Sequence, residues 1–115
     1  MRYILLIYGN EAAAATASAA EQQAEFTAYM TYTEELRAAG IMTGGDPLLP
    51  TSAATTVRIR NDKTLTTHGP FAETTEQLLG FYIINCENLD EALVWAAKNP
   101  GSKTGSIEVR PIVEM

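Results

Sequence analysis

Acid and base side chains gather in one short stretch around the only histidine of the chain. His68 is followed by Gly69-Pro70 and then by Glu73 and Glu76. An imidazole titrates near neutral pH, so His68 is a candidate general acid or base, with Glu73 or Glu76 as the group that orients it. The alternative interpretation is that His68 is an ordinary loop or turn residue.

The residues after His68 restrict the turn but do not by themselves define a site. Proline fixes its own φ and biases Gly69 toward extended backbone, which would aim a neighbouring side chain reproducibly. Glu73 and Glu76 are three positions apart, so they share a face if the segment is helical and could share a proton or bind a cation. The alternative is a solvated first helical turn. With one histidine and no acidic loop, we expect no metal site.

A second candidate group consists of charged residues on two alternating segments. Arg58 and Arg60 alternate with Val57 and Ile59, and Glu108 and Arg110 alternate with Ile107 and Val109. Guanidinium groups can bind a carboxylate or phenolate, so Arg58, Arg60 and Arg110, with Glu108, are candidate ligand-binding residues. Ion pairing with Glu108 across strands or subunits is the alternative.

Composition limits the class of protein. The 115 residues are long enough for one domain, which we expect to span residues 1–115. Fourteen acidic residues against eight basic ones give a net charge of −6, which disfavours nucleic acid and anionic membrane partners. The single cysteine, Cys86, fits a reducing, cytoplasmic compartment, and we expect it to be a buried small hydrophobic residue. The apolar run Tyr3–Tyr8 is too short for a secretion signal.

Hydrophobic periodicity and turn residues predict the elements that must position these side chains. Ser18 with Glu21 fits a capping box, and the helix that follows is expected to end at Gly40. A second helix is expected after Asn88. The remaining expectations are strands at Tyr3–Tyr8, Thr55–Arg60, Thr64–Thr67, Leu79–Cys86 and around Ile107 and Val109, a turn at Asn61-Asp62-Lys63, and a loop at Ile41–Ser52.

The order of elements predicts an α+β fold, a ferredoxin-like βαββαβ unit with an extra hairpin arm and an antiparallel sheet. Two helices can cover only one sheet face, and we expect Val57, Ile59, Ile107 and Val109 to lie on that covered face. The other face would then be partly apolar in a monomer, so we expect it to be buried against a second subunit.

Several segments together resemble the YCII-related family, specifically the branch named for its DGPF motif. The resemblance runs nearly end to end and rests on Arg2–Gly9, Ala39-Gly40, Ala54–Arg58, Gly69–Glu73, Glu76–Leu78, Gly80–Tyr82 and Glu108–Pro111. It implies a dimeric α+β barrel of two ferredoxin-like subunits and a small bacterial cytosolic protein. It also implies that some relatives occur beside, or fused to, sigma factors of the extracytoplasmic-function type.

Two residues depart from the pattern of that branch. His68 stands where the motif has aspartate, and Thr75 stands where lysine is usual. If the aspartate does chemistry in the family, this chain has exchanged a carboxylate for an imidazole. Roles at these positions are therefore not carried over.

Three functional hypotheses follow. The first is a small cofactor-independent enzyme in which a dimer cleft binds a small anionic or phenolic molecule and His68 acts as acid or base. The second is a non-catalytic ligand-sensing or regulatory homodimer linked to such sigma factors. The third is a dimeric scaffold without a ligand, and fold alone does not decide among them.

Overall fold

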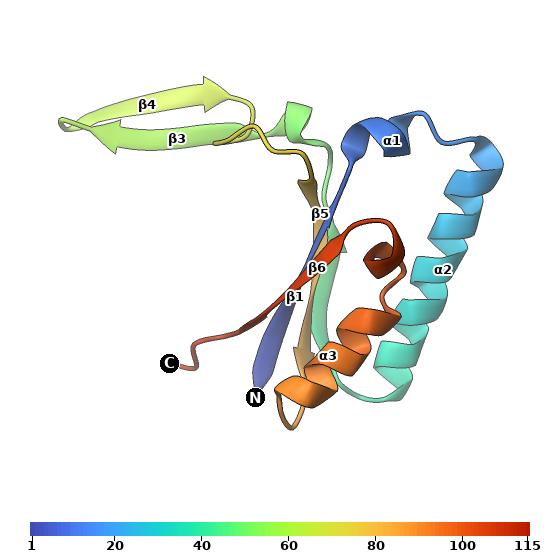
Figure 1. Ribbon diagram of the computed structural model, residues 1–115. Coiled ribbons are helices and arrows are strands. Elements are labelled where there is room, and N and C mark those ends of the chain that lie inside the picture. The colour runs from blue at the N-terminus through green and yellow to red at the C-terminus, as the bar shows by residue number, and fades with distance from the viewer.

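The computed structural model describes residues 1–115 and has two separate sheets (Figure 1). The larger sheet has four strands in the order β2-β5-β1-β6, all antiparallel to their neighbours. The smaller sheet is the hairpin β3-β4. The elements are β1 (Arg2–Gly9), α1 (Glu11–Ala15), α2 (Ala19–Ala38), β2 (Met42–Pro47), β3 (Thr55–Arg60), β4 (Lys63–His68), β5 (Gln77–Asn85), α3 (Leu89–Lys98) and β6 (Ser106–Pro111).

This topology confirms the ferredoxin-like α+β prediction, with one correction to the strand assignment. The second strand of the main sheet is β2, a segment that the sequence predicts to be loop because it contains Gly44, Gly45 and Pro47. Thr55–Arg60 does form a strand, but it belongs to the separate hairpin inserted between β2 and β5. β2 lies at the edge of the sheet, where glycine and proline are tolerated.

The predicted helix boundaries are confirmed. Ser18 Oγ accepts a hydrogen bond from the Glu21 amide at 3.1 Å, and the Glu21 carboxylate accepts one from the Ser18 amide at 3.2 Å, so two backbone amides at the start of α2 are paired. Gly40, with φ of +72°, ends this helix in the left-handed conformation that favours glycine. Asn88 caps α3 by accepting from the Glu91 amide.

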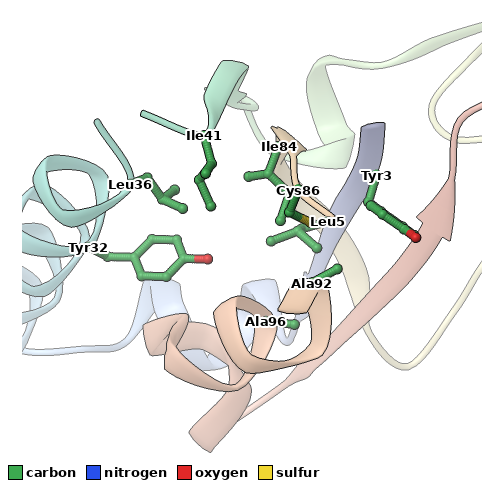
Figure 2. Close-up of a cluster of buried hydrophobic side chains, with 9 residues drawn as sticks. All are labelled: Tyr3, Leu5, Tyr32, Leu36, Ile41, Ile84, Cys86, Ala92 and Ala96. Atoms are coloured by element: carbon green, nitrogen blue, oxygen red, sulfur yellow. The ribbon is translucent and has the colours of Figure 1, made fainter. Parts of the chain in front are cut away.

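The hydrophobic core lies between one face of the main sheet and the helices (Figure 2). Leu5 and Ile84 from the central strands and Leu36 from α2 are completely buried. Tyr32 of α2 donates a 2.8 Å hydrogen bond to the Trp95 carbonyl of α3, which joins the two helices. Cys86 is part of this core as expected, and burial, with Glu91 nearby, raises the pKa of its thiol.

The opposite face of the main sheet, called the open face here, has no helix on it (Figure 1). Residues of β1 alternate between buried positions on the helix side and half-buried positions on the open face. The strand register places Ile83 beside Ile4, Phe81 beside Leu6 and Leu78 beside Tyr8. The open face therefore carries a row of apolar side chains.

The hairpin β3-β4 projects from the end of the main sheet, away from the helices (Figure 1). Asn61 and Asp62, with φ of +52° and +62°, form the tight turn at its tip, where a turn was predicted. Val57 and Ile59 are 60% and 65% exposed, so the prediction that helices cover them is wrong, whereas Ile107 and Val109 do pack against the core. The radius of gyration is 16.1 Å, above the roughly 13 Å of a compact domain of this length.

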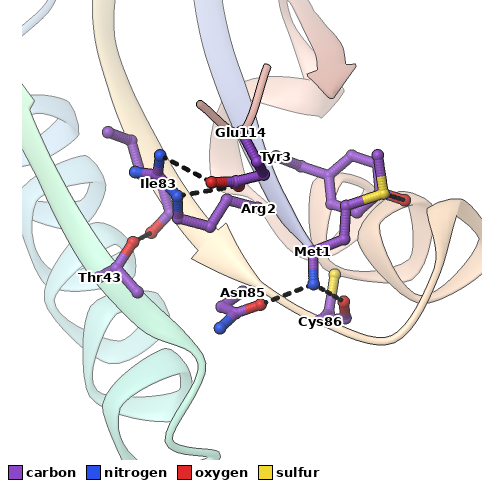
Figure 3. A network of polar contacts seen from close by, with 8 residues as sticks. All are labelled: Met1, Arg2, Tyr3, Thr43, Ile83, Asn85, Cys86 and Glu114. Atoms are coloured by element: carbon purple, nitrogen blue, oxygen red, sulfur yellow. Dashed lines mark hydrogen bonds and ion pairs between the residues drawn. The ribbon is translucent and has the colours of Figure 1, made fainter. Parts of the chain in front are cut away.

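The N-terminal end of β1 is held by polar contacts (Figure 3). The Met1 amine donates to the Asn85 side-chain oxygen at 2.9 Å and to the Cys86 carbonyl at 3.2 Å. Arg2 Nε donates to Glu114 at 3.1 Å, and this hydrogen bond lowers the pKa of the Glu114 carboxyl. These contacts tie both chain ends to the sheet.

We expect Leu36→Ala to reduce the free energy of unfolding by about 2–5 kcal/mol, because it leaves a cavity between α2 and the sheet. Leu49→Ala, at a leucine that is 79% exposed, is the matched control and should change it by less than about 0.5 kcal/mol. Urea denaturation followed by circular dichroism measures both. Similar losses for the two variants would contradict this assignment of the core.

Candidate functional site

His68 is the last residue of β4, at the base of the hairpin, where it pairs with Thr55 of β3. Its side chain is exposed and makes no hydrogen bond with the rest of the chain. The turn after it is held by backbone contacts: the Gly69 amide donates to the Ala54 carbonyl at 2.7 Å, and Thr56 Oγ1 donates to the Gly69 carbonyl at 2.8 Å. Gly69 has φ of +106°, a conformation that other residues rarely adopt.

The segment after Gly69 is irregular, so the helical turn considered for Glu73 and Glu76 is not formed. Glu73 is exposed without a hydrogen-bond partner. Glu76 is half-buried, and its carboxylate accepts a 2.8 Å hydrogen bond from Ser106 Oγ at the start of β6. Of the two carboxylates, only Glu76 is attached to the main sheet.

The three candidate arginines lie on two different sheets. Arg58 Nη2 donates to the Phe71 carbonyl at 3.4 Å, which ties the hairpin to the loop after His68. Arg60 donates to the carbonyl of its neighbour Ile59 at 3.0 Å. Arg110 Nε donates to Glu108 at 2.8 Å on β6. One chain therefore does not bring Arg58 or Arg60 together with Arg110, and Glu108 is already paired within its own strand.

Polar groups of several elements nevertheless meet on the open face. The register places Ser106 beside Tyr8, Glu108 beside Leu6 and Arg110 beside Ile4. Glu76 reaches this row through Ser106. The open face is thus an apolar surface whose β6 side carries the Glu76 carboxylate, the Ser106 hydroxyl and the ion pair between Glu108 and Arg110.

A cleft of about 530 Å³ lies on the other side of the sheet, between α2 and the edge formed by β2 and β5. Its walls are mostly apolar, with Phe26, Met30 and Tyr82 among them, and Glu25, Arg37 and Asp46 supply charge. This cleft could not be predicted from the sequence, because the periodicity of α2 indicates an apolar face but not how much of that face the sheet covers. In the structure, Phe26 and Met30 of this helix face remain 62% and 53% exposed, which shows that the sheet leaves this part of the face uncovered.

Tyr29 connects this cleft to the core. Its hydroxyl donates to Asn99 Oδ1 at 3.2 Å, and Asn99, which is 1% exposed, also accepts from the Gly101 amide at 2.8 Å. Burial, reinforced by the Glu25 carboxylate, raises the pKa of Tyr29 to about 12. A Cβ atom at Gly101 would lie 2.7 Å from the Tyr29 hydroxyl, so any larger residue there would displace the Tyr29 side chain.

No three His, Cys, Asp or Glu side chains gather as metal ligands would. No helix combines the length and apolar character needed to cross a membrane.

Comparisons with known proteins agree on the fold. The YCII-related domain matches residues 1–115. An uncharacterised protein of Rhizobium meliloti (strain 1021) is 40% identical over 114 residues, which cover 97% of this chain and 92% of that protein. The structure of 5-chloro-2-hydroxyhydroquinone dehydrochlorinase from Burkholderia phenoliruptrix AC1100, in complex with 2,5-dihydroxybenzoquinone, aligns with a TM-score of 0.58 at 16% identity, covering 100% of this chain and 96% of that one.

The raised pKa of Tyr29 predicts a loss of stability in alkali. Because the folded state holds the phenol in its neutral form, this contribution is present below the unfolded pKa of 10.0 and is lost as pH rises through about 12. We expect Tyr29→Phe to lower stability at pH 7 by about 0.5–1.5 kcal/mol through the lost hydrogen bond, and to make the decline above pH 10 shallower. Urea unfolding at a series of pH values measures both. Parallel pH profiles for the two proteins would contradict the prediction.

Proposed function

Because this chain belongs to the YCII-related family, we propose that it forms a homodimer with its sheets face to face, and that the cleft between them binds a small phenolic or anionic molecule for acid/base chemistry. The observation that carries this proposal is the open face, an apolar surface bordered by Glu76, Ser106, Glu108 and Arg110.

The dimer is supported by the apolar row on the open face. Ile4, Leu6, Phe81 and Ile83 are half-buried on a face that no helix covers. Large exposed apolar patches usually mark interaction surfaces, and a twofold contact lets one surface cover its own copy. The dimeric α+β barrel expected from the sequence is therefore retained as part of the proposal.

A flat aromatic ligand fits the chemistry of this cleft. Leu6, Phe81 and Tyr8 offer a surface on which a ring can lie, and polar groups along β6 offer partners for hydroxyl or carboxylate substituents. The structural neighbour was solved with 2,5-dihydroxybenzoquinone, a small ring of this kind, which supports the ligand class. At 16% identity that likeness extends to the fold, so the ligand of this chain is proposed on the residues of the open face.

The roles of the individual residues are as follows. His68 takes a proton from, or returns one to, the bound molecule, Glu73 or Glu76 orients the imidazole, and Arg110, Arg58 or Arg60 binds the anion. Proton transfer or elimination requires no cofactor. We also propose that the chain belongs to the DGPF branch, with His68 in the position of the motif aspartate and Thr75 in that of the usual lysine. We propose further that it is a cytoplasmic bacterial protein.

This assignment requires the second subunit. In one chain His68 is exposed and separate from Glu76 and Arg110, which lie on the main sheet. The hairpin that carries His68 projects toward the side on which a partner would sit (Figure 1). A second subunit would therefore have to cover His68 and exclude water from it, as general acid/base catalysis requires.

A second candidate function is a non-catalytic sensing or regulatory dimer, linked to sigma factors of the extracytoplasmic-function type. The observation that favours it is that no side chain of the same chain makes a hydrogen bond to the His68 imidazole. The two functions share the ligand cleft and differ in whether the bound molecule is converted. Product analysis by mass spectrometry after incubation with a panel of substituted quinols separates them.

We expect the protein to behave as a dimer by light scattering at micromolar concentration. Leu6→Lys, which places a charge in the centre of the open face, should shift it to the mass of one chain. Leu49→Lys is the matched control, because Leu49 is 79% exposed and lies outside the main sheet; it should leave the dimer intact. A wild-type protein with the mass of one chain would contradict the proposed dimer.

If His68 is the general acid or base, we expect His68→Ala to lower kcat/KM for a substituted quinol that the protein converts by about 100-fold or more. The affinity for 2,5-dihydroxybenzoquinone, measured by calorimetry, should stay within about threefold of that of the unchanged protein. His68→Asp restores the motif residue and tests whether a carboxylate can replace the imidazole. An unchanged rate in both variants would assign His68 to the turn alone.

A further inference from the structure

The hairpin β3-β4 has the composition of a contact surface, but its large apolar side chains are exposed. Its strands pair only with each other, and such two-stranded units are marginally stable in water unless they pack against something. One face carries Val57 and Ile59 with uncharged neighbours across the strand at Thr64 and Thr66. Both apolar side chains are more than half exposed.

The direction of the hairpin relates it to the proposed dimer. It projects from the sheet on the side opposite the helices, past the open face (Figure 1). A strand of six residues spans about 20 Å, whereas two sheets packed face to face lie about 10 Å apart. When a second copy covers the open face, the tip of the hairpin therefore extends beyond the partner's sheet to the level of the partner's helices.

At that level, every copy presents the cleft between α2 and the β2 edge. Phe26 and Met30 line it and are 62% and 53% exposed, an unusual degree of exposure for two large side chains of the same helix face. A cleft of about 530 Å³ has room for several aliphatic side chains. It lies beside an edge strand, which leaves it accessible from the side of the sheet.

The charges of the two surfaces are complementary. The hairpin, residues 55–68, carries Arg58, Arg60 and Lys63 against a single acidic residue, Asp62. Helix α2 carries four glutamates against one arginine, and the charged residues that line the cleft itself are Glu25, Asp46 and Arg37, two acidic and one basic. Opposite charges at the rim of an apolar contact favour this pairing over others.

We infer that the β3-β4 hairpin of each subunit docks into the α2–β2 cleft of its partner, with Val57 and Ile59 on Phe26 and Met30. The basic residues Arg58, Arg60 and Lys63 lie on the other face of the hairpin and so at the rim of this contact. This inference rests on the homodimer of the proposed function and adds a second, exchanged contact to it. The occupant of the cleft is thus a segment of a second copy. By docking its hairpin, each subunit also fixes the position of its own His68 at the hairpin base.

Cross-linking between mixed variants tests the contact. Purified Ile59→Cys and Met30→Cys proteins are mixed, allowed to exchange subunits and treated with a short bis-maleimide. We expect a cross-linked heterodimer, identified by intact mass spectrometry. Leu93→Cys replaces Met30→Cys in the matched control, because Leu93 is an exposed leucine of α3 outside the cleft, and it should give no cross-link with Ile59→Cys. The native Cys86 is buried, and wild-type protein is treated in parallel.

The outcomes separate this inference from the proposed dimer. A dimer by light scattering whose Met30→Cys pair fails to cross-link, or cross-links no better than the Leu93→Cys pair, overturns the hairpin docking and leaves the homodimer standing. A protein with the mass of one chain overturns both. Preferential cross-linking through Met30→Cys supports the inference.

A second measurement needs no cross-linker. Ile59→Thr removes an apolar contact while keeping a strand-forming residue, and should raise the dimer dissociation constant by about tenfold or more. Leu65→Thr, on the opposite face of the same hairpin, should change it less than about twofold. Equal effects of the two substitutions on dissociation, measured by analytical ultracentrifugation, would overturn the docking orientation.

Discussion

The architecture depends on one constraint, which is that a four-stranded sheet has two faces and this chain has helices for only one of them. Leu5, Ile84 and Leu36 form a core on the covered side within a single chain. The residues of the same strands that point the other way, such as Leu6 and Phe81, have no such cover. Every feature considered for function lies on, or extends from, the side that the chain leaves uncovered, except for the cleft beside α2.

Much of the fold could be predicted from local sequence because its signals are local. The capping box of Ser18 and Glu21 fixes the start of α2, and Gly40 fixes its end, whatever the rest of the chain does. Strand β2 could not be found in this way, because Gly44, Gly45 and Pro47 have low strand propensity and the segment becomes a strand only through pairing with β5. Alternation along Thr55–Arg60 identifies a strand with two different faces, but it carries no information about which sheet the strand joins.

The arrangement of the candidate site residues was even less predictable from local sequence than the strand pairing. Nearness in sequence groups His68 with Glu73 and Glu76, yet the structure leaves Glu73 free, attaches Glu76 to Ser106 of β6 and sets His68 on the hairpin. Arg58 and Arg110 occupy similar alternating patterns but lie on separate sheets. In α2, the spacing of Phe26 and Met30 matches that of core residues, and only the three-dimensional arrangement shows that the sheet stops short of them.

The separation of the hairpin from the core has a consequence for how related chains diverge. Because Val57, Ile59 and Leu65 are exposed and lie outside the buried core, exchanging them for other strand-forming residues would leave that core unchanged. Under the inferred docking, the surface that these residues meet is the cleft beside α2 of the partner, and the two surfaces can change in step. In a cell that makes several chains of this fold, such paired changes in hairpin and cleft would keep each chain assembled with its own copies and prevent mixed oligomers.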